Sequence, residues 1–287
     1  IEGQQLPSAQ VSMPTFGDEL LKLPPCVIPP GRDNAYAVVI GIEKYRDITP
    51  SQYAVADAQL VRDYLTKAMG FSEENVMYAI NERASKNDLK KYFEVWLKNR
   101  VDSNSTVIIY YSGHGAPNPL SGESFIVPYD GDPNVIEDTG YPLKNLYDSL
   151  NKLPCDKILV VLDSCFSGAG GPRTVLAKGT RPIVVTMKDA GLEGSKIAVL
   201  SAASGGQISG TYDEKQHGLF TYYFLRELLG EADKDKDKKI YLSELYEYLK
   251  PEVIKKARSD YREQEPQLLP SAEHLGEWSK IPLEILK

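Results

Sequence analysis

The sequence predicts an α/β protein: a three-layer α/β/α sandwich whose central sheet is mostly parallel and has roughly six strands. Two apolar runs, at residues 106–111 and 157–162, are continuous rather than alternating, which is typical of strands buried on both faces. Segments with helical apolar spacing separate the predicted strands, and this alternation favours right-handed crossovers between parallel strands. With 287 residues, the chain can form one large domain of this class.

In the first half of the chain, apolar runs predict strands and the segments between them have the spacing of helices. The predicted strands are residues 36–42, 75–80 and 106–111. The predicted helices are residues 53–69 and 87–97. The first has an apolar face made of Ala54, Ala58, Val61 and Leu65. The second can begin at a cap formed by Ser85 or Asn87.

The second half of the chain continues the same alternation. Residues 125–128 are expected to form a short hairpin arm, and a helix at 143–153 leads into the strand at 157–162. The remaining predicted elements are a strand at 196–202, helices at 219–229 and 242–257, and an extended segment at 267–269.

Two segments lie outside this pattern. Residues 1–34 lack periodicity and contain proline pairs, which predicts an extended leader or linker before a single domain at residues 35–287. Residues 169–194 hold five glycines and two prolines, and they are predicted to form a flexible linker within the domain. The chain begins with isoleucine rather than methionine, which indicates a fragment or a processed form.

Composition narrows the possible partners and compartments. A net charge of −7, without a lysine or arginine cluster, argues against nucleic acid or an anionic membrane as the main partner. No segment has the length of a membrane span. Cys26, Cys155 and Cys165 form neither a paired framework nor a Cys-x-x-Cys spacing, which argues against a disulfide scaffold or a structural zinc site and slightly favours the cytoplasm.

Two motifs about fifty residues apart carry the chemistry. They are Tyr110-Tyr-Ser-Gly-His114-Gly115 and Leu162-Asp163-Ser-Cys165-Phe-Ser-Gly168. Each follows a predicted strand, and open α/β sheets bind ligands at the carboxyl ends of their strands. Taken alone, the cysteine can be a buried apolar residue and the histidine a turn residue. Together they favour a Cys/His hydrolase, because an imidazole can remove the thiol proton at neutral pH.

These motifs resemble those of the caspase-like clan of cysteine peptidases, nearest to its bacterial and metacaspase-type branch. The resemblance rests on Ser112-Gly-His114-Gly115 and on the Asp163-Ser-Cys165 motif, and it extends over about residues 35–271. It implies a caspase-like three-layer sandwich and a cysteine endopeptidase with a Cys/His dyad. Cys165 would be the nucleophile and His114 the general base and acid, while the backbone N–H groups of Gly115 and Cys165 would bind the oxyanion.

Substrate preference depends on Asp163. Animal caspases have a Gln-Ala-Cys-Arg-Gly type sequence at the nucleophile, whereas this chain has a carboxylate two residues before the cysteine. A carboxylate there would repel aspartate and attract arginine or lysine at P1, the preference that the metacaspase resemblance also implies. The alternative is that Asp163 caps a turn. Weaker candidates for further acids in this pocket are Asp47, Asp213 and Glu214.

The resemblance also bears on the linker at residues 169–194. The resemblance implies a cleavable connection after the strand that precedes the nucleophile, as in caspase-like enzymes. Self-processing is therefore predicted after a basic residue of this linker, the alternative being an ordinary surface loop. The candidate cleavage sites follow Arg173, Lys178, Arg181 and Lys188.

A separate acidic pattern indicates possible calcium binding. The acidic residues at positions 1, 3, 5 and 12 of an EF-hand-like loop are Asp233, Asp235, Asp237 and Glu244. Lys238 replaces the usual glycine, and neighbouring lysines reduce the negative charge, so a solvated charged turn is the alternative. Catalysis itself is expected to need no cofactor.

Three functional hypotheses follow. The favoured one is a cysteine endopeptidase that acts on a protein or peptide substrate and cleaves after arginine or lysine. The alternatives are a non-catalytic caspase-like module that binds a peptide, and a calcium-responsive interaction protein. Neither the natural substrate nor the oligomeric state follows from the sequence.

Overall fold

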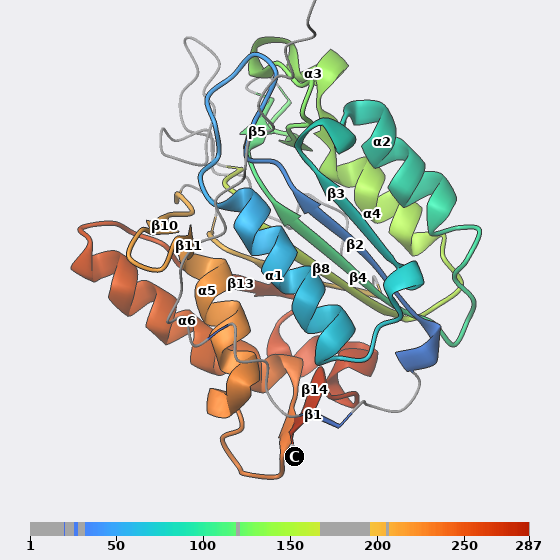
Figure 1. Cartoon of the computed structure of the whole chain (residues 1–287), viewed down its shortest axis with the longest axis vertical. Helices are drawn as coiled ribbons and strands as arrows, with labels where there is room; N and C mark the ends of the chain where they lie inside the picture. Colours follow the sequence, from blue (N-terminus) through green and yellow to red (C-terminus); the bar gives the residue numbers. More distant parts are fainter. Residues whose placement is uncertain are drawn as a thin grey trace, which may run out of the picture.

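The central element is a six-stranded sheet with the strand order β13-β9-β8-β4-β2-β3 (Figure 1). The computed structural model describes residues 20, 26–27, 32–118, 121–166, 196–204 and 207–286. All neighbouring strands of this sheet are parallel except β13, which runs antiparallel to β9. Its strands are β2 (Ala35–Gly41), β3 (Val76–Ile80), β4 (Thr106–Ser112), β8 (Lys157–Asp163), β9 (Ile197–Ser201) and β13 (Gln267–Leu269).

Helices cover both faces of the sheet, which gives three layers (Figure 1). One face is covered by α1 (Ala54–Lys67), α5 (Leu219–Arg226) and α6 (Leu242–Ser259). The other face is covered by α2 (Lys86–Lys90), the π-helical turn that continues it (Lys91–Trp96), and α4 (Leu143–Asn151).

The central strands are buried on both faces, as their continuous apolar sequences predict. In β8, Leu159 and Val161 belong to the core under α1 and α5, while Ile158, Val160 and Leu162 belong to the core under α2 and α4. Successive side chains of a strand point to opposite faces, so one apolar run fills two cores.

Smaller sheets surround the main one. The first contains β5 (Gly115–Pro117), β6 (Ser124–Ile126) and β7 (Tyr141–Pro142). The second contains β1 (Cys26–Val27), β14 (Glu284–Leu286) and β12 (Lys239–Ile240), and the third is the pair β10 (Thr211–Tyr212) and β11 (His217–Gly218). A short helix, α3, spans Ile136–Thr139, and a second π-helical turn, Glu227–Glu231, follows α5. Short 3₁₀ turns lie at Arg32–Asn34, Glu73–Asn75, Asn81–Arg83, Pro133–Val135, Ala272–His274 and Gly276–Ser279.

The fold class predicted from the sequence is confirmed: the sheet has six strands, is mostly parallel and lies between helices. The helix predicted at 87–97 is present, and it is α-helical over Lys86–Lys90 and π-helical over Lys91–Trp96. Ser85 caps its start through a hydrogen bond from the Asp88 N–H at 3.2 Å. Part of the expected leader pairs with the domain, since β1 lies against β14. The predicted linker at 169–194 lies outside the described residues.

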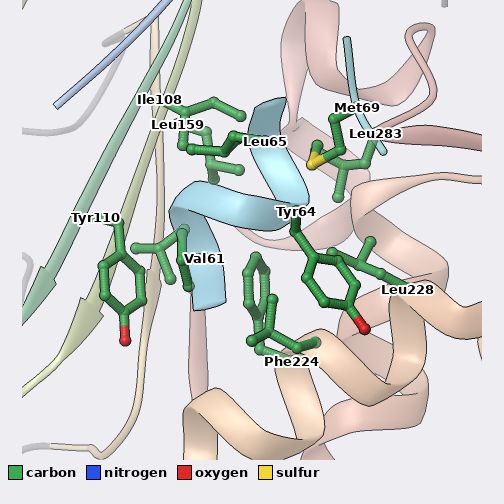
Figure 2. Close-up of a pocket in the computed structure, with 12 residues that line it drawn as sticks. Val61, Tyr64, Leu65, Met69, Ile108, Tyr110, Leu159, Phe224, Leu228 and Leu283 are labelled. Carbon is green, nitrogen blue, oxygen red and sulfur yellow. The ribbon is translucent and has the colours of Figure 1, made fainter. Parts of the chain in front are cut away.

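A small apolar cavity of about 20 Å³ lies in the core between the sheet, α1 and α5 (Figure 2). In Figure 2, Leu65 of α1 lies beside Ile108 and Leu159 of the sheet, and Val61 of α1 lies beside Tyr110. Its lining is apolar, so it is a packing defect of the core rather than a binding site for a polar substrate. Among the helices of the described residues, none has both the length and the apolar character that a membrane crossing requires.

Candidate active site

The two predicted catalytic residues follow the ends of neighbouring strands. The parallel register pairs Ser112, the last residue of β4, with Asp163, the last residue of β8. His114 and Cys165 therefore each lie two positions beyond a paired residue, at the same carboxyl edge of the sheet. Both side chains are buried, with exposed fractions of 1 % and 0 %.

Gly115 lies directly against the main chain of Cys165. A Cβ atom at this position would be 2.5 Å from the Cys165 carbonyl oxygen and 2.6 Å from Cδ1 of Phe166. Real Cβ atoms do not approach other atoms so closely, so a residue without a side chain is required here. This close contact joins the segment after His114 to the segment that carries Cys165.

The imidazole of His114 is oriented by a main-chain carbonyl. Its Nε2 lies 2.8 Å from the carbonyl oxygen of Thr49. A carbonyl oxygen can only accept a hydrogen bond, so Nε2 carries the proton and Nδ1 is the basic nitrogen of the neutral ring. The side chain of Thr49 has no part in this contact, which is why no sequence motif pointed to it.

Two tyrosines hold the main chain of His114 from both sides. The Tyr45 hydroxyl accepts a hydrogen bond from the His114 N–H at 2.6 Å, and the Tyr111 hydroxyl donates to the His114 carbonyl oxygen at 2.6 Å. The ring of Tyr45 also packs on the imidazole, with 4.8 Å between the ring centroids. A Cβ atom on Gly113 would come within 2.7 Å of both hydroxyls, so glycine is needed for this arrangement.

The sulfur of Cys165 contacts the main chain of Ser209. The Ser209 N–H donates a hydrogen bond to Sγ. The thiol in turn donates to the carbonyl oxygen of Ser209, with 3.7 Å between Sγ and that oxygen. Ser209 lies in a segment without regular secondary structure between β9 and β10, and it is fully buried. The sequence contained no signal for this contact, because only main-chain atoms of Ser209 take part.

Asp163 is fully buried, and its carboxylate accepts hydrogen bonds from Ser209 and Thr221. The hydroxyls of Ser209 and Thr221 each donate to its carboxylate at 2.6 Å, and the Thr221 N–H donates at 3.3 Å. Thr221 lies in the first turn of α5, where main-chain N–H groups lack partners within the helix. Asp163 therefore binds the start of α5 in this structure. This contact is similar to the turn-capping role that is the alternative to substrate selection by Asp163.

A second buried carboxylate, Asp57, lies near the first. It accepts hydrogen bonds from His217 Nδ1 at 2.8 Å, from the Gly218 N–H at 3.1 Å and from the Ser112 hydroxyl at 3.4 Å. Because Ser112 pairs with Asp163 in the sheet, both acids belong to one polar cluster beneath the candidate active site. Asp57 follows Ala54 by one helical turn on the apolar face of α1, and this charge at a core position was the signal that sequence inspection could have used.

The weaker acidic candidates lie elsewhere. Asp47 is exposed and forms an ion pair with Arg46 at 2.7 Å. Asp213 and Glu214 occupy the exposed turn between β10 and β11. His217 lies in β11 immediately before Gly218, the N-cap of α5.

The acidic loop has oxygen atoms close enough to share one cation. Ligand oxygens of Asp233, Asp235 and Asp237 all lie within 4.8 Å of one another. Lys238 has φ of 67°, the left-handed conformation for which such loops normally use glycine. Glu244 instead accepts a hydrogen bond from the Tyr241 N–H at 3.0 Å, and burial, together with the three aspartates, raises the pKa of its carboxyl. The oxygen donors fit a hard divalent cation such as calcium.

Comparison with known proteins identifies a family. The model of the caspase domain, peptidase family C14, matches residues 34–273. The chain is 31% identical to metacaspase-6 of Arabidopsis thaliana over 142 residues, which are 46% of this chain and 38% of that protein. It is 24% identical to metacaspase-1 of Eremothecium gossypii over 153 residues, which are 47% of this chain and 32% of that protein. The matched region thus spans about a third of the length of these relatives.

Solved structures agree at the level of the fold. Protein GSU0716 from Geobacter sulfurreducens superposes with a TM-score of 0.54 at 16% identity, covering 82% of this chain and 92% of that one. Caspase-1 from Spodoptera frugiperda superposes with a TM-score of 0.53 at 13% identity, covering 83% and 86%. Because the caspase-domain model matches most of its length, the chain belongs to the caspase-domain family of cysteine peptidases.

Proposed function

We propose that this protein is a cysteine endopeptidase that cleaves peptide bonds after arginine or lysine. The observation that carries the proposal is the placement of His114 and Cys165 at equivalent positions beyond two paired strands, with Gly115 packed against the Cys165 main chain. Membership of the caspase-domain family supports the same chemistry. The proposed substrate is a protein or peptide.

In the proposed reaction, Nδ1 of His114 accepts the thiol proton, and the thiolate of Cys165 attacks the scissile carbonyl carbon. Main-chain N–H groups of Gly115 and Cys165 donate to the oxyanion that forms. The protonated imidazole then gives its proton to the leaving amine as the C–N bond breaks. Water hydrolyses the resulting thioester and releases the acid product. The Thr49 carbonyl stabilises the imidazolium, because its hydrogen bond from Nε2 strengthens when the ring is charged.

We further propose that Asp163 selects the basic P1 side chain. Its carboxylate shares one neighbour with the nucleophile, since Ser209 contacts both Asp163 and Cys165. The hydroxyls of Ser209 and Thr221 are neutral and rotatable donors, which a guanidinium or ammonium group can replace. Asp57 places a second carboxyl group in the same buried cluster, where it is hydrogen-bonded to Ser112 and His217.

Hydrolysis of matched fluorogenic peptides tests the proposal. Cys165→Ala and His114→Ala should lose turnover of an arginine peptide, whereas Cys155→Ala, which changes the other buried cysteine, should retain it. Asp163→Asn preserves the shape of the side chain and should lower kcat/KM for arginine and lysine peptides by about 10²–10³, because a buried charge pair is lost. A wild-type protein that prefers the aspartate peptide would contradict the assigned pocket.

Two other functions have distinct outcomes. A non-catalytic peptide-binding module would bind an arginine peptide without releasing the fluorophore at any protein concentration. For the loop at Asp233, Asp235 and Asp237, we propose weak calcium binding, supported by the convergence of its oxygen atoms. A calcium-responsive interaction protein would require that loop and not Cys165.

A further inference from the structure

Residues 207–210 cover the candidate nucleophile with main-chain atoms. Sγ of Cys165 contacts both the N–H and the carbonyl oxygen of Ser209, and the sulfur has no exposed surface. A peptide carbonyl carbon must approach Sγ within about 3–3.5 Å before it reacts, so it needs the space that Ser209 now occupies. This segment, residues 207–210, is called the covering segment below.

The covering segment contacts both the nucleophile, Cys165, and the acid proposed to select P1, Asp163. While the main chain of Ser209 contacts Sγ, its hydroxyl donates to Asp163 at 2.6 Å. The N–H and the carbonyl oxygen of Ser209 both lie against Sγ, so they fill the space through which a scissile carbonyl carbon would approach. One residue therefore blocks the reacting atom and fills the donor positions that a basic P1 side chain would use.

Side chains after α6 hold the covering segment in place. Gln264 is buried, with 3 % of its surface exposed; its Oε1 accepts from the Gly210 N–H at 2.8 Å and its Nε2 donates to the Ala202 carbonyl at 3.1 Å. At the other end of the segment, Gln207 Oε1 accepts from the Glu265 N–H at 2.7 Å. Both ends are thus fastened to residues 264–265.

The guanidinium of Arg262 lies against Gly210. A Cβ atom there would lie 1.9 Å from Nη1 of Arg262. Arg262 also donates to the carbonyl oxygen of Thr211 at 2.8 Å and forms an ion pair with Asp260 at 3.0 Å. The covering segment therefore packs closely on residues 260–265.

We propose that the covering segment is an autoinhibitory latch: Gln264 holds it over Cys165, and the thiol becomes reactive only when the segment moves away. The inference rests on the proposed function of Cys165 and adds a regulatory step to it. The closed state is a resting state, and a substrate or another ligand that displaces Ser209 from Asp163 also uncovers the sulfur.

Alkylation by iodoacetamide tests the latch without a peptide substrate. The rate at Cys165 is measured by peptide mass mapping in the native protein and in urea, and Cys155, fully buried in the core, reports on unfolding in the same sample. Native Cys165 should react at least about tenfold more slowly than in urea. Gln264→Ala removes the side-chain half of two hydrogen bonds and should raise the native rate about tenfold, with Cys155 still protected.

Two further variants complete the test. Glu263→Ala changes an exposed neighbour of Gln264 and should keep the wild-type rate. If Gln264→Ala unfolds, as reaction of Cys155 would reveal, Gln207→Ala releases the other end of the covering segment and must raise the rate at Cys165. The latch is refuted if native Cys165 already reacts as fast as in urea, or if the folded variants react no faster than wild type. In either case hydrolysis of an arginine peptide would leave the peptidase assignment standing. A folded variant in which Cys165 is readily alkylated but no arginine peptide is hydrolysed would refute only that assignment.

Discussion

Glu227 is a buried carboxyl whose ionisation should make the stability of the protein depend on pH. It lies at the start of the π-helical turn after α5, and its side chain is fully buried. Neither carboxyl oxygen has a hydrogen-bond partner among the described residues. Burial, followed by repulsion from Glu231, raises its pKa to about 8, although Arg226 acts in the opposite direction.

The sign follows from proton binding in the two states. An unfolded glutamate has a pKa near 4.3, so between about pH 4.5 and pH 8 the folded protein holds a proton that the unfolded chain releases. The free energy of unfolding contributed by Glu227 is therefore highest below pH 4.5 and falls as pH rises towards 8. Its slope approaches about 1.4 kcal/mol per pH unit, which gives an upper bound of about 4 kcal/mol between pH 5 and pH 8.

Urea unfolding of wild type and Glu227→Gln at pH 5, 6, 7, 8 and 9 measures this effect. Glutamine stays neutral throughout, so the variant should gain stability relative to wild type as pH rises and should level off above pH 8. Glu247→Gln, an exposed carboxylate that pairs with Lys234, is the matched control and should run parallel to wild type. Parallel profiles for Glu227→Gln and wild type would show that Glu227 is not protonated in the folded protein.

Three further predictions concern the core, the linker and the acidic loop. Leu159→Ala removes a side chain that lines the apolar cavity, and it should lower the free energy of unfolding in urea by about 3–5 kcal/mol. The control Val95→Ala changes an exposed side chain and should lower it by no more than about 0.5 kcal/mol. A small effect at Leu159 would mean that the core collapses around the gap. Active protein should cut itself after a basic residue of the 169–194 linker while Cys165→Ala stays intact by mass; a chain that remains whole while it hydrolyses an arginine peptide would rule out self-processing. Calorimetric titration should detect calcium binding that Asp235→Asn weakens, and equal heats for the two proteins would exclude the loop as a calcium site.

The layered fold followed from the sequence because its signals are local. Continuous apolar runs identified β4 and β8, and their alternation with helical spacing predicted parallel strands. The hairpin arm expected at 125–128 overlaps β6, which pairs antiparallel with β5 and β7. The other small sheets were missed, since strands such as β10 and β11 contain two residues each and carry no periodicity. The change from α-helix to π-helix after Lys90 was also missed, because the π-helical residues continue the same helix.

The candidate site was predictable only where side chains carry its chemistry. His114 and Cys165 occur in motifs that end strands, so their positions at one edge of the sheet followed from the fold class. The Thr49 carbonyl and the main chain of Ser209 could not be predicted, because any residue type supplies those atoms. Asp57 is different, because a charged residue on the apolar face of a helix is a signal that the sequence itself carries.

β14 has a consequence for where this protein can be attached to a tag or a surface. It lies between β1 and β12 and pairs with both. One strand therefore fixes the position of β1, which precedes the main sheet in the sequence, and of β12, which follows the acidic loop. Arg32 binds the segment just before β14: its guanidinium donates to the carbonyl oxygens of Pro282 and Leu283 at 3.0 Å and 2.8 Å. A fusion that pulls residues 284–286 out of this sheet would loosen the entry segment and the acidic loop together. Immobilisation through the exposed turn at Asp213 and Glu214 would leave the pairing of β14 with β1 and β12 intact. It would instead apply force to the segment that follows Ser209.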